Sequence, residues 1–313
     1  MASNSSVVVI DLSPMIKVYE DGTVERLFGT IFVPPSPEDP ITGVSSKDIT
    51  ISSQVSARLY LPKITDPSQK LPILVYFHGG GFCGESAFSS VIHSYVNILV
   101  SEAKALAVSV EYRLAPENPL PAAYEDSWAA LQWVASHYNS ENPGADKEPW
   151  LINNGNFDKL YIGGDSAGAN IVHNLAMKVS AESLDGGVKI LGAICSQPYF
   201  WGSNEEKSLP YRIWMFVYPS APGGIDNPMI NPMAEDAPSL SGLGCSRLFV
   251  CVSEKDRLRE RGLLYVEALR KSGWKGELEL VDVEGQGHVF QVHNPHSEKA
   301  KSLIKQMASF IKA

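Results

Sequence analysis

Residues 163–170 read Gly-Gly-Asp-Ser-Ala-Gly-Ala-Asn and place Ser166 at the centre of a Gly-x-Ser-x-Gly pentapeptide. Apolar residues 160–162 precede this stretch, and apolar residues at helical spacing follow it over 171–179. The stretch therefore predicts a strand, a sharp turn and a helix. Small residues at Gly164 and Gly168 let the strand and the helix approach closely while the serine takes a strained backbone. The pentapeptide also occurs in ordinary turns, so partner residues elsewhere must decide whether Ser166 is a nucleophile.

Composition restricts the kind of ligand. The chain has 313 residues, of which 44% are hydrophobic and 19% charged, as expected for a globular protein with a substantial core. It carries 26 basic and 35 acidic residues, a formal charge of -9, which argues against nucleic acid or an anionic membrane as the main partner. The expected ligand is a small uncharged or cationic molecule.

The N-terminus and the cysteines indicate a compartment. Residues 1–6 carry no basic cluster, and the apolar run 7–10 is too short for a signal peptide or a membrane span. No pair of cysteines has Cys-x-x-Cys spacing, which favours free thiols in a reducing compartment. The four cysteines are Cys83, Cys195, Cys245 and Cys251. We therefore expect a cytoplasmic protein whose oligomeric state the sequence does not reveal.

Strands and helices alternate along most of the chain. Strands are expected at 16–19, 23–28, 47–52, 56–61, 71–77, 107–112, 160–162, 190–195, 247–252 and 277–283, and helices at 88–104, 122–137, 171–179, 260–272 and 297–312. The first four strands predict the antiparallel edge of a sheet. The alternation from residue 71 onward predicts a mostly parallel α/β sheet with helices on both faces.

An aromatic and proline-rich stretch, 197–231, interrupts this alternation. We interpret it as a helical insertion over the carboxyl edge of the sheet, where ligands bind in open α/β sheets. A surface loop that packs its own aromatic side chains is the alternative. Because no repeat or linker divides the chain, we expect a single domain, 1–313, with a small cap contributed by about 1–45 and 198–231.

A serine hydroxyl needs a base, and the base needs an orienting acid. In hydrolases built on such a turn, the order along the chain is serine, acid, histidine. His288 lies in a glycine-flanked loop directly after the last predicted strand, and Asp256 follows the strand before it. These residues are the predicted base and acid of Ser166. Glu254 is the nearby rival for the acid, and Asp282, inside a strand, is a weaker one.

The other histidines that follow the serine have different expectations. His173 lies on the helix after the serine and is expected to pack within the fold. His293 and His296, together with His288, suggest a metal site, but their spacing follows no zinc pattern, and Pro295 breaks any helix between them. We expect solvated histidines there, with no metal and no cofactor.

A glycine-rich segment follows the buried strand 71–77. Its sequence, His78-Gly79-Gly80-Gly81, lets backbone N–H groups converge on a developing oxyanion. The N–H of Ala167, the residue after the nucleophile, would join them. A phosphate-binding loop is disfavoured because no Lys-Ser/Thr pair follows at a helix start. We therefore expect an oxyanion hole made by Gly80, Gly81 and Ala167.

Several segments are similar to those of one family. They are His78 to Phe82, Tyr-Arg-Leu-Ala-Pro-Glu at 112–117, Pro-Ala-Ala-Tyr-Glu-Asp at 121–126, 164–168, Asn231-Pro232 and His288. Over nearly its whole length the chain resembles the plant carboxylesterases of the hormone-sensitive-lipase type, within the α/β-hydrolases. The resemblance implies an α/β-hydrolase fold, a catalytic triad of Ser166, Asp256 and His288, and the oxyanion donors already named.

One subgroup is more similar still. Residues 56–63, 85–88, 227–232, 244–247 and 272–277 resemble relatives in monoterpenoid indole alkaloid biosynthesis, such as catharanthine and tabersonine synthases. Those cyclases have altered the triad and the oxyanion loop, whereas this chain keeps Asp256, His288 and all three glycines. The difference favours hydrolysis over cyclisation.

The resemblance implies a serine carboxylesterase that hydrolyses a carboxylic ester of a plant specialised metabolite, and a methyl ester is the expected substrate. An alkaloid ester whose acid then loses CO₂ would fit the subgroup. A cyclase or lyase, a 2-hydroxyisoflavanone dehydratase-like enzyme and a hormone-receptor-like binding protein remain alternatives.

Residues near the oxyanion loop, the cap and the histidine loop are expected to contact substrate, although each can equally be core packing. They are Phe82, Ser86, Tyr199, Trp214, Tyr218 and Val289.

Overall fold

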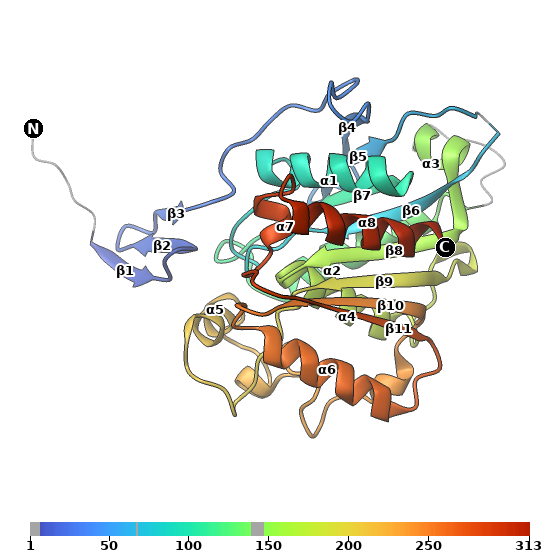
Figure 1. The fold of residues 1–313 in the computed structure, drawn as a ribbon. Helices are drawn as coiled ribbons and strands as arrows, with labels where there is room; N and C mark the ends of the chain where they lie inside the picture. The colour runs from blue at the N-terminus through green and yellow to red at the C-terminus, as the bar shows by residue number, and fades with distance from the viewer. Residues whose placement is uncertain (1–6, 67, 139–146) are drawn as a thin grey trace, which may run out of the picture.

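A mixed eight-stranded sheet forms the centre of the protein (Figure 1). The computed structural model describes residues 7–66, 68–138 and 147–313. The sheet has the order β11-β10-β9-β8-β6-β7-β5-β4. Its strands are β4 (Ser45–Thr50), β5 (Ser56–Leu61), β6 (Leu71–Phe77), β7 (Leu106–Glu111), β8 (Gly155–Asp165), β9 (Ile190–Ser196), β10 (Cys245–Ser253) and β11 (Glu277–Val283). Neighbours from β11 to β7 are parallel, and β5 pairs antiparallel with β7 and β4. The predicted mostly parallel sheet is confirmed.

Helices cover both faces of this sheet, as predicted. One apolar cluster joins the sheet to α1 and α8, and a second joins the opposite face to α2, α4 and α6. The helices are α1 (Ser90–Ala103), α2 (Ala122–Ala135), α3 (Pro149–Asn154), α4 (Ala167–Lys178), α6 (Arg259–Ser272), α7 (Phe290–His293) and α8 (Glu298–Lys312). None of the helices in the described residues is both long and apolar enough to cross a membrane.

The N-terminal hairpin is not part of the central sheet, which corrects the sequence-based prediction. Strands β1 (Val8–Asp11), β2 (Ile16–Tyr19) and β3 (Val24–Arg26) form a separate three-stranded antiparallel sheet, drawn to the left of the main body in Figure 1. A turn at residues 21–22 joins β2 to β3. Only β4 and β5 supply the antiparallel edge, because local turn signals identify a hairpin but not the sheet that it joins.

The interrupting stretch contains helix α5 (Leu209–Val217) and the short 3-10 helix η2 (Gly224–Asp226). Two further 3-10 turns, η1 (Asp185–Gly187) and η3 (Leu240–Gly242), lie in connections. The α5 segment touches the N-terminal sheet, since Arg212 Nη2 donates to the carbonyl of Asp11 at 2.6 Å. Two segments that are about 200 residues apart in sequence are thus in contact.

The turn between β8 and α4 depends on close backbone contact. A Cβ on Gly168 would lie 1.9 Å from the carbonyl oxygen of Phe77, and a Cβ on Gly164 would lie 2.5 Å from the backbone of Gly168. Atoms this close cannot coexist, and backbone cannot swing away as a flexible side chain can. The two glycines of the pentapeptide therefore let α4 begin directly against the ends of β6 and β8.

Substituting Gly168→Ala should destabilise the fold by about 3 kcal/mol or more, because the new methyl group has no space. Gly242→Ala is the matched control: its Cβ would meet only Met177 Cε, at 3.9 Å. The control should change the free energy of unfolding by less than about 0.5 kcal/mol. Urea unfolding of both variants provides the measurement. If both variants are equally stable, the backbone around Gly168 can accommodate a methyl group and the prediction is wrong.

Candidate active site

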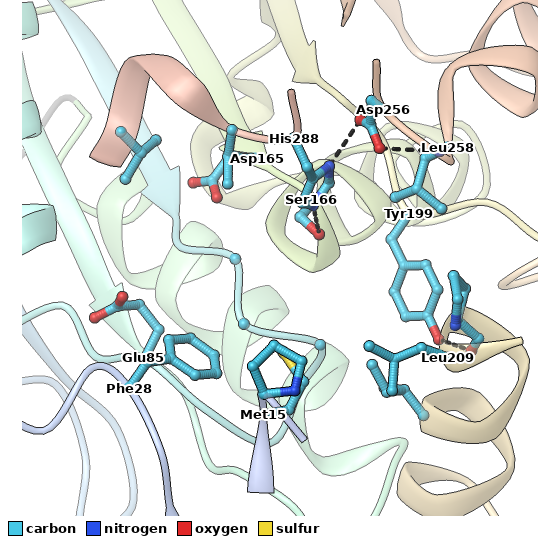
Figure 2. A pocket seen from close by; sticks show the side chains of 18 of the residues that line it. Met15, Phe28, Glu85, Asp165, Ser166, Tyr199, Leu209, Asp256, Leu258 and His288 are labelled. Carbon is cyan, nitrogen blue, oxygen red and sulfur yellow. Dashed lines mark hydrogen bonds and ion pairs between the residues drawn. The ribbon is translucent and has the colours of Figure 1, made fainter. Parts of the chain in front are cut away.

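Ser166 lies on the sharp turn at the end of β8, with φ 52° and ψ -114°. Its N–H donates to the carbonyl of Ser196 at 2.9 Å, and its carbonyl accepts from the N–H groups of Asn170 and Tyr199, both at 3.0 Å. These bonds hold a backbone conformation that is unfavourable for a residue with a Cβ. The side chain of Ser166 consequently faces the space beyond the carboxyl end of the sheet, as Figure 2 shows.

The three predicted residues come together in one hydrogen-bonded chain (Figure 2). His288 Nε2 lies 2.9 Å from Ser166 Oγ, and His288 Nδ1 lies 2.7 Å from Asp256 Oδ2. The other carboxylate oxygen of Asp256 accepts from the N–H of Leu258 at 2.9 Å. Because a carboxylate only accepts, Nδ1 carries the proton and Nε2 is free to receive one from the serine hydroxyl.

The rival residues are occupied elsewhere. Glu254 Oε2 accepts from the N–H of Gly285 at 2.6 Å, which shapes the loop that leads to the histidine. Asp282 forms an ion pair with Arg259 at 2.6 Å on β11. Among these three carboxylates, Asp256 is the one hydrogen-bonded to His288.

The other histidines that follow Ser166 in the chain lie in three different environments. His173 is buried, bonded to Tyr265 Oη at 3.0 Å, and burial lowers its pKa to about 3. It therefore packs within the fold, as the sequence suggested. His293 borders the pocket and His296 lies exposed before α8. No group of three potential metal ligands was found within the described ranges.

The glycine-rich segment turns sharply beside the serine. Gly80 has φ +99° and Gly81 has φ +60°, and a Cβ on Gly80 would lie 2.2 Å from the carbonyl of Gly84. The carbonyl of Gly80 accepts from the N–H groups of Cys83 and Gly84, at 3.1 and 2.9 Å. The N–H groups of Gly80 and Gly81 donate no hydrogen bond to any group in the described part of the chain.

The third expected donor belongs to the start of a helix. Ala167 is the first residue of α4, where N–H groups have no partner within the helix and the dipole favours negative charge. An oxyanion hole requires backbone N–H donors near the nucleophile, and Gly80 and Gly81 line the same cavity as Ser166, which directly precedes Ala167.

A second carboxyl group, that of Asp165, lies directly before Ser166 in the chain. Asp165 is 3% exposed and borders the pocket, and one of its carboxylate oxygens accepts from the hydroxyl of Tyr76. Burial raises the pKa of Asp165 to about 6, and the hydrogen bond from Tyr76 partly opposes this. Asp165 and Asp256 thus occupy different surroundings, since Asp256 is oriented by two N–H donors.

A cavity of about 660 Å³ opens above these residues. Two of the predicted contacts, Tyr199 and Val289, do line it. The wall also has residues that the sequence did not suggest, mostly apolar ones from the N-terminal sheet, α5 and the loop after Asp256. They include Met15, Leu27, Phe28, Leu209, Ile213, Arg257 and Leu258. A Cβ on Gly81 would lie 3.1 Å from both Met15 Cε and Ile213 Cγ2, so both segments press on the oxyanion loop.

Four predicted contacts are not in the lining and are corrected here. Phe82 is fully buried against the ring of Tyr124, with centroids 5.5 Å apart, because its positive φ of 61° turns the side chain into the core. Ser86 Oγ donates to Glu111 at 2.9 Å. Trp214 and Tyr218 pack against each other, and Trp214 Nε1 donates to the carbonyl of Gly224 at 2.9 Å within the cap.

The protein family follows from the fold and from the similarity of the chain to known proteins. Residues 74–292 match the alpha/beta hydrolase fold family, and the chain belongs to it. The chain is 55% identical to 2-hydroxyisoflavanone dehydratase of Glycyrrhiza echinata, over 96% of this chain and 95% of that protein. It is also 55% identical to tabersonine synthase of Catharanthus roseus, over 99% of each. Among solved structures it is similar to a hyperthermophilic esterase from Pyrobaculum calidifontis, with 30% identity, a TM-score of 0.69 and coverage of 88% of this chain and 86% of that one. The predicted family resemblance is confirmed.

Replacing Asp256 with Asn should slow the labelling of Ser166 by a fluorophosphonate by at least about 10²-fold, because a neutral amide cannot stabilise the imidazolium that forms. Glu254→Gln removes an equal charge nearby but keeps an acceptor for Gly285, and it should slow labelling by less than about tenfold. Both rates are measured by quenching the labelling reaction at a series of times and quantifying the adduct by intact-mass spectrometry. A larger effect at Glu254 would reverse the assignment of the acid.

Asp165→Asn should change how stability depends on pH. Burial raises the pKa of Asp165 from 3.8 to about 6, so the folded state holds this proton more tightly than the unfolded state. The stability that it contributes is present below about pH 4 and is lost as pH rises through about 6. Relative to Asp165→Asn, the wild type should lose up to roughly 3 kcal/mol of unfolding free energy across this window. Urea unfolding at several pH values measures the unfolding free energies of both proteins. If the difference between wild type and Asp165→Asn stays constant from about pH 4 to about pH 7, the prediction is wrong.

Proposed function

We propose that this protein is a serine carboxylesterase. The observation that carries the proposal is the unbroken chain Asp256–His288–Ser166 at the floor of a largely apolar cavity of about 660 Å³. A hydroxyl whose proton can pass to a neutral, oriented imidazole is an activated nucleophile. The solved esterase that shares this fold at 30% identity supports the same reaction class.

The geometry supports the following sequence of steps. Ser166 Oγ attacks the ester carbonyl while His288 Nε2 takes the hydroxyl proton, and the N–H groups of Gly80, Gly81 and Ala167 receive the oxyanion. His288 returns the proton to the departing alkoxide, which leaves as an alcohol. Water, deprotonated by His288, then attacks the acyl-enzyme and releases the acid and the free serine. No cofactor takes part.

The proposed substrate is a methyl ester of a plant specialised metabolite, specifically a monoterpenoid indole alkaloid. Hydrolysis would release methanol and a carboxylic acid. Where this carboxyl group lies β to a carbonyl, it is then lost as CO₂, and the carbon that carried it gains a proton. The similarity to tabersonine synthase and the apolar pocket wall support this class of substrate. We also propose that the protein acts in the cytoplasm, since its four cysteines are free and buried.

Two other functions make different demands on the same residues. A cyclase, or a dehydratase such as one relative is named, would transfer protons without an acyl-enzyme. A hormone-receptor-like protein would have no use for an activated serine. The 2.9 Å contact between His288 and Ser166 therefore favours the esterase over the receptor.

Hydrolysis of p-nitrophenyl acetate by wild type should fall by at least about 10³-fold in Ser166→Ala, because no other group can form the acyl-enzyme. Ser109→Ala is the control: Ser109 is fully buried, and its hydroxyl has no partner among the described residues, so activity should persist. A folded wild type without activity would refute the esterase proposal. Alkaloid turnover that survives Ser166→Ala would favour a cyclase or lyase.

A further inference from the structure

Four polar side chains form a continuous hydrogen-bonded network next to the triad. They are Ser196 at the end of β9, Gln197, Ser253 at the end of β10 and Gln291 in α7, each no more than 2% exposed. Gln291 Nε2 donates to Ser196 Oγ and to Gln197 Oε1, both at 3.0 Å. Gln197 Nε2 donates to Ser253 Oγ at 2.9 Å, and Ser196 Oγ donates to Gln197 Oε1 at 2.7 Å. The network, here called the glutamine network, links two strands to a helix.

Two members of the glutamine network are also bonded to triad residues through their backbone. The carbonyl of Ser196 accepts from the N–H of Ser166 at 2.9 Å. The carbonyl of Ser253 accepts from the N–H of Asp256 at 3.0 Å. The positions of the nucleophile and of the acid are therefore tied to the strand ends that the network joins.

The third link reaches the base. Gln291 follows His288 by three residues, across Val289, which has φ 43°. The histidine loop lies between β11 and a helix of four residues, α7, so it has little secondary structure of its own to fix it. The two hydrogen bonds from Gln291 attach the start of α7 to Ser196 and Gln197 at the end of β9. Through them α7 is linked indirectly to Ser166, by the backbone of Ser196, and to Asp256, by way of Ser253.

The glutamine is not explained by stability alone. Its Oε1 is buried and has no hydrogen-bond partner among the described residues. An unpaired buried amide oxygen is unfavourable, and an apolar side chain of similar volume would avoid that penalty. A polar residue kept at such a site needs another reason, and the bonds made by its Nε2 supply one.

We propose that Gln291 is a positioning residue, which holds the His288 imidazole in line with Ser166 and Asp256 through the glutamine network. The proposal rests on the proposed function, since it assigns a role in the same triad. Gln291 contacts neither substrate nor any reacting atom and acts only by fixing the histidine loop. Small displacements of a catalytic group lower the rate of the chemical step more than they weaken substrate binding.

Gln291→Met tests this role, because methionine keeps the volume and the unbranched shape but makes none of the hydrogen bonds. Asn97→Leu is the matched control. Asn97 is a second buried amide with an unpartnered oxygen, on α1, bonded to His93 at 2.9 and 3.1 Å. Kinetics with p-nitrophenyl acetate give kcat and KM, and urea unfolding gives the stability of both variants.

For Gln291→Met we expect kcat to fall by about 10-fold to 10²-fold with KM nearly unchanged. Asn97→Leu should keep wild-type kcat even if its stability changes. Wild-type kcat in folded Gln291→Met, or an equal fall in both variants, would overturn the proposal. If Gln291→Met does not fold, Ser196→Ala removes one of the two hydrogen bonds that Gln291 donates, and unchanged kcat together with an unchanged His288 Nδ1–H resonance in that variant would overturn the proposal.

A spectroscopic readout separates this proposal from the function on which it rests. The proton on His288 Nδ1, bonded to Asp256, should give a strongly downfield NMR resonance, assigned by its absence in His288→Ala. In Gln291→Met this resonance should broaden or shift, and in Asn97→Leu it should not. An inactive wild type would defeat the esterase proposal, yet an unchanged resonance in Gln291→Met would by itself defeat the positioning role.

Discussion

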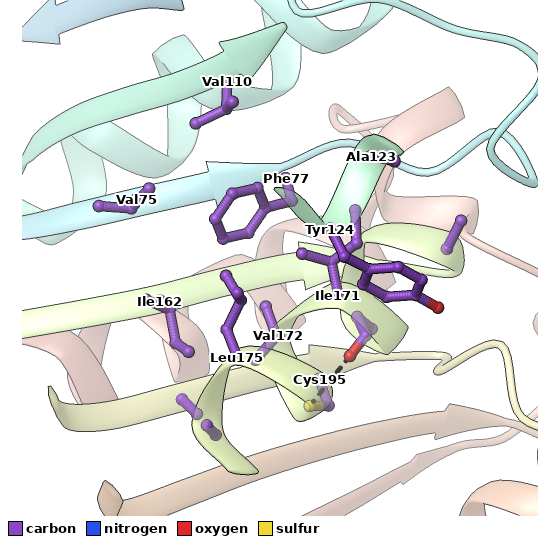
Figure 3. Close-up of a cluster of buried hydrophobic side chains, with 14 of the residues drawn as sticks. Val75, Phe77, Val110, Ala123, Tyr124, Ile162, Ile171, Val172, Leu175 and Cys195 are labelled. Carbon is purple, nitrogen blue, oxygen red and sulfur yellow. Dashed lines mark hydrogen bonds between the residues drawn. The ribbon is translucent and has the colours of Figure 1, made fainter. Parts of the chain in front are cut away.

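The close contact between the start of α4 and the ends of β6 and β8 is the constraint on which the rest of the site depends. Backbone meets backbone there, since the position a Cβ would take on Gly168 is 1.9 Å from the carbonyl of Phe77. Figure 3 shows the apolar side chains behind this contact, with Phe77 on β6 facing Ile171 and Leu175 on α4. Their burial fixes the helix against the sheet, and the fixed helix in turn holds Ser166 at φ 52° and presents the N–H of Ala167.

Residues that the sequence predicts well are those whose task is fixed by the local chain. The pentapeptide, the glycine-rich segment and the order of Ser166, Asp256 and His288 each depend on a few consecutive residues and on the carboxyl ends of parallel strands. In the structure, His288 lies within hydrogen-bond distance of Asp256, at 2.7 Å, and of Ser166, at 2.9 Å. The strands and helices of the central sheet were predictable for the same reason, since their apolar periodicity is local.

The pocket wall could not be predicted in the same way, because it depends on which side of a residue faces the cavity. Phe82 follows three glycines, and only its backbone angle of 61° shows that its ring enters the core. On α5, Ile213 borders the cavity, while its neighbour Trp214 is bonded within the cap. Met15 reaches the same wall from the turn between β1 and β2, a segment that no local signal places beside the cavity. Such contacts form between segments about 200 residues apart, and composition does not encode them.

The site divides into a part held by backbone and a part held by side chains. Ser166 and the N–H groups of the glycine-rich segment have positions that glycines and strand ends determine, so few substitutions can move them. His288 lies in a loop, and its orientation depends on Asp256 and on the buried amides and hydroxyls near it. Substitutions in the second part can change the reaction without disturbing the fold. Two relatives that are each 55% identical to this chain carry the names of a dehydratase and a synthase, and one fold can host different reactions because the chemistry depends on the site residues that it carries.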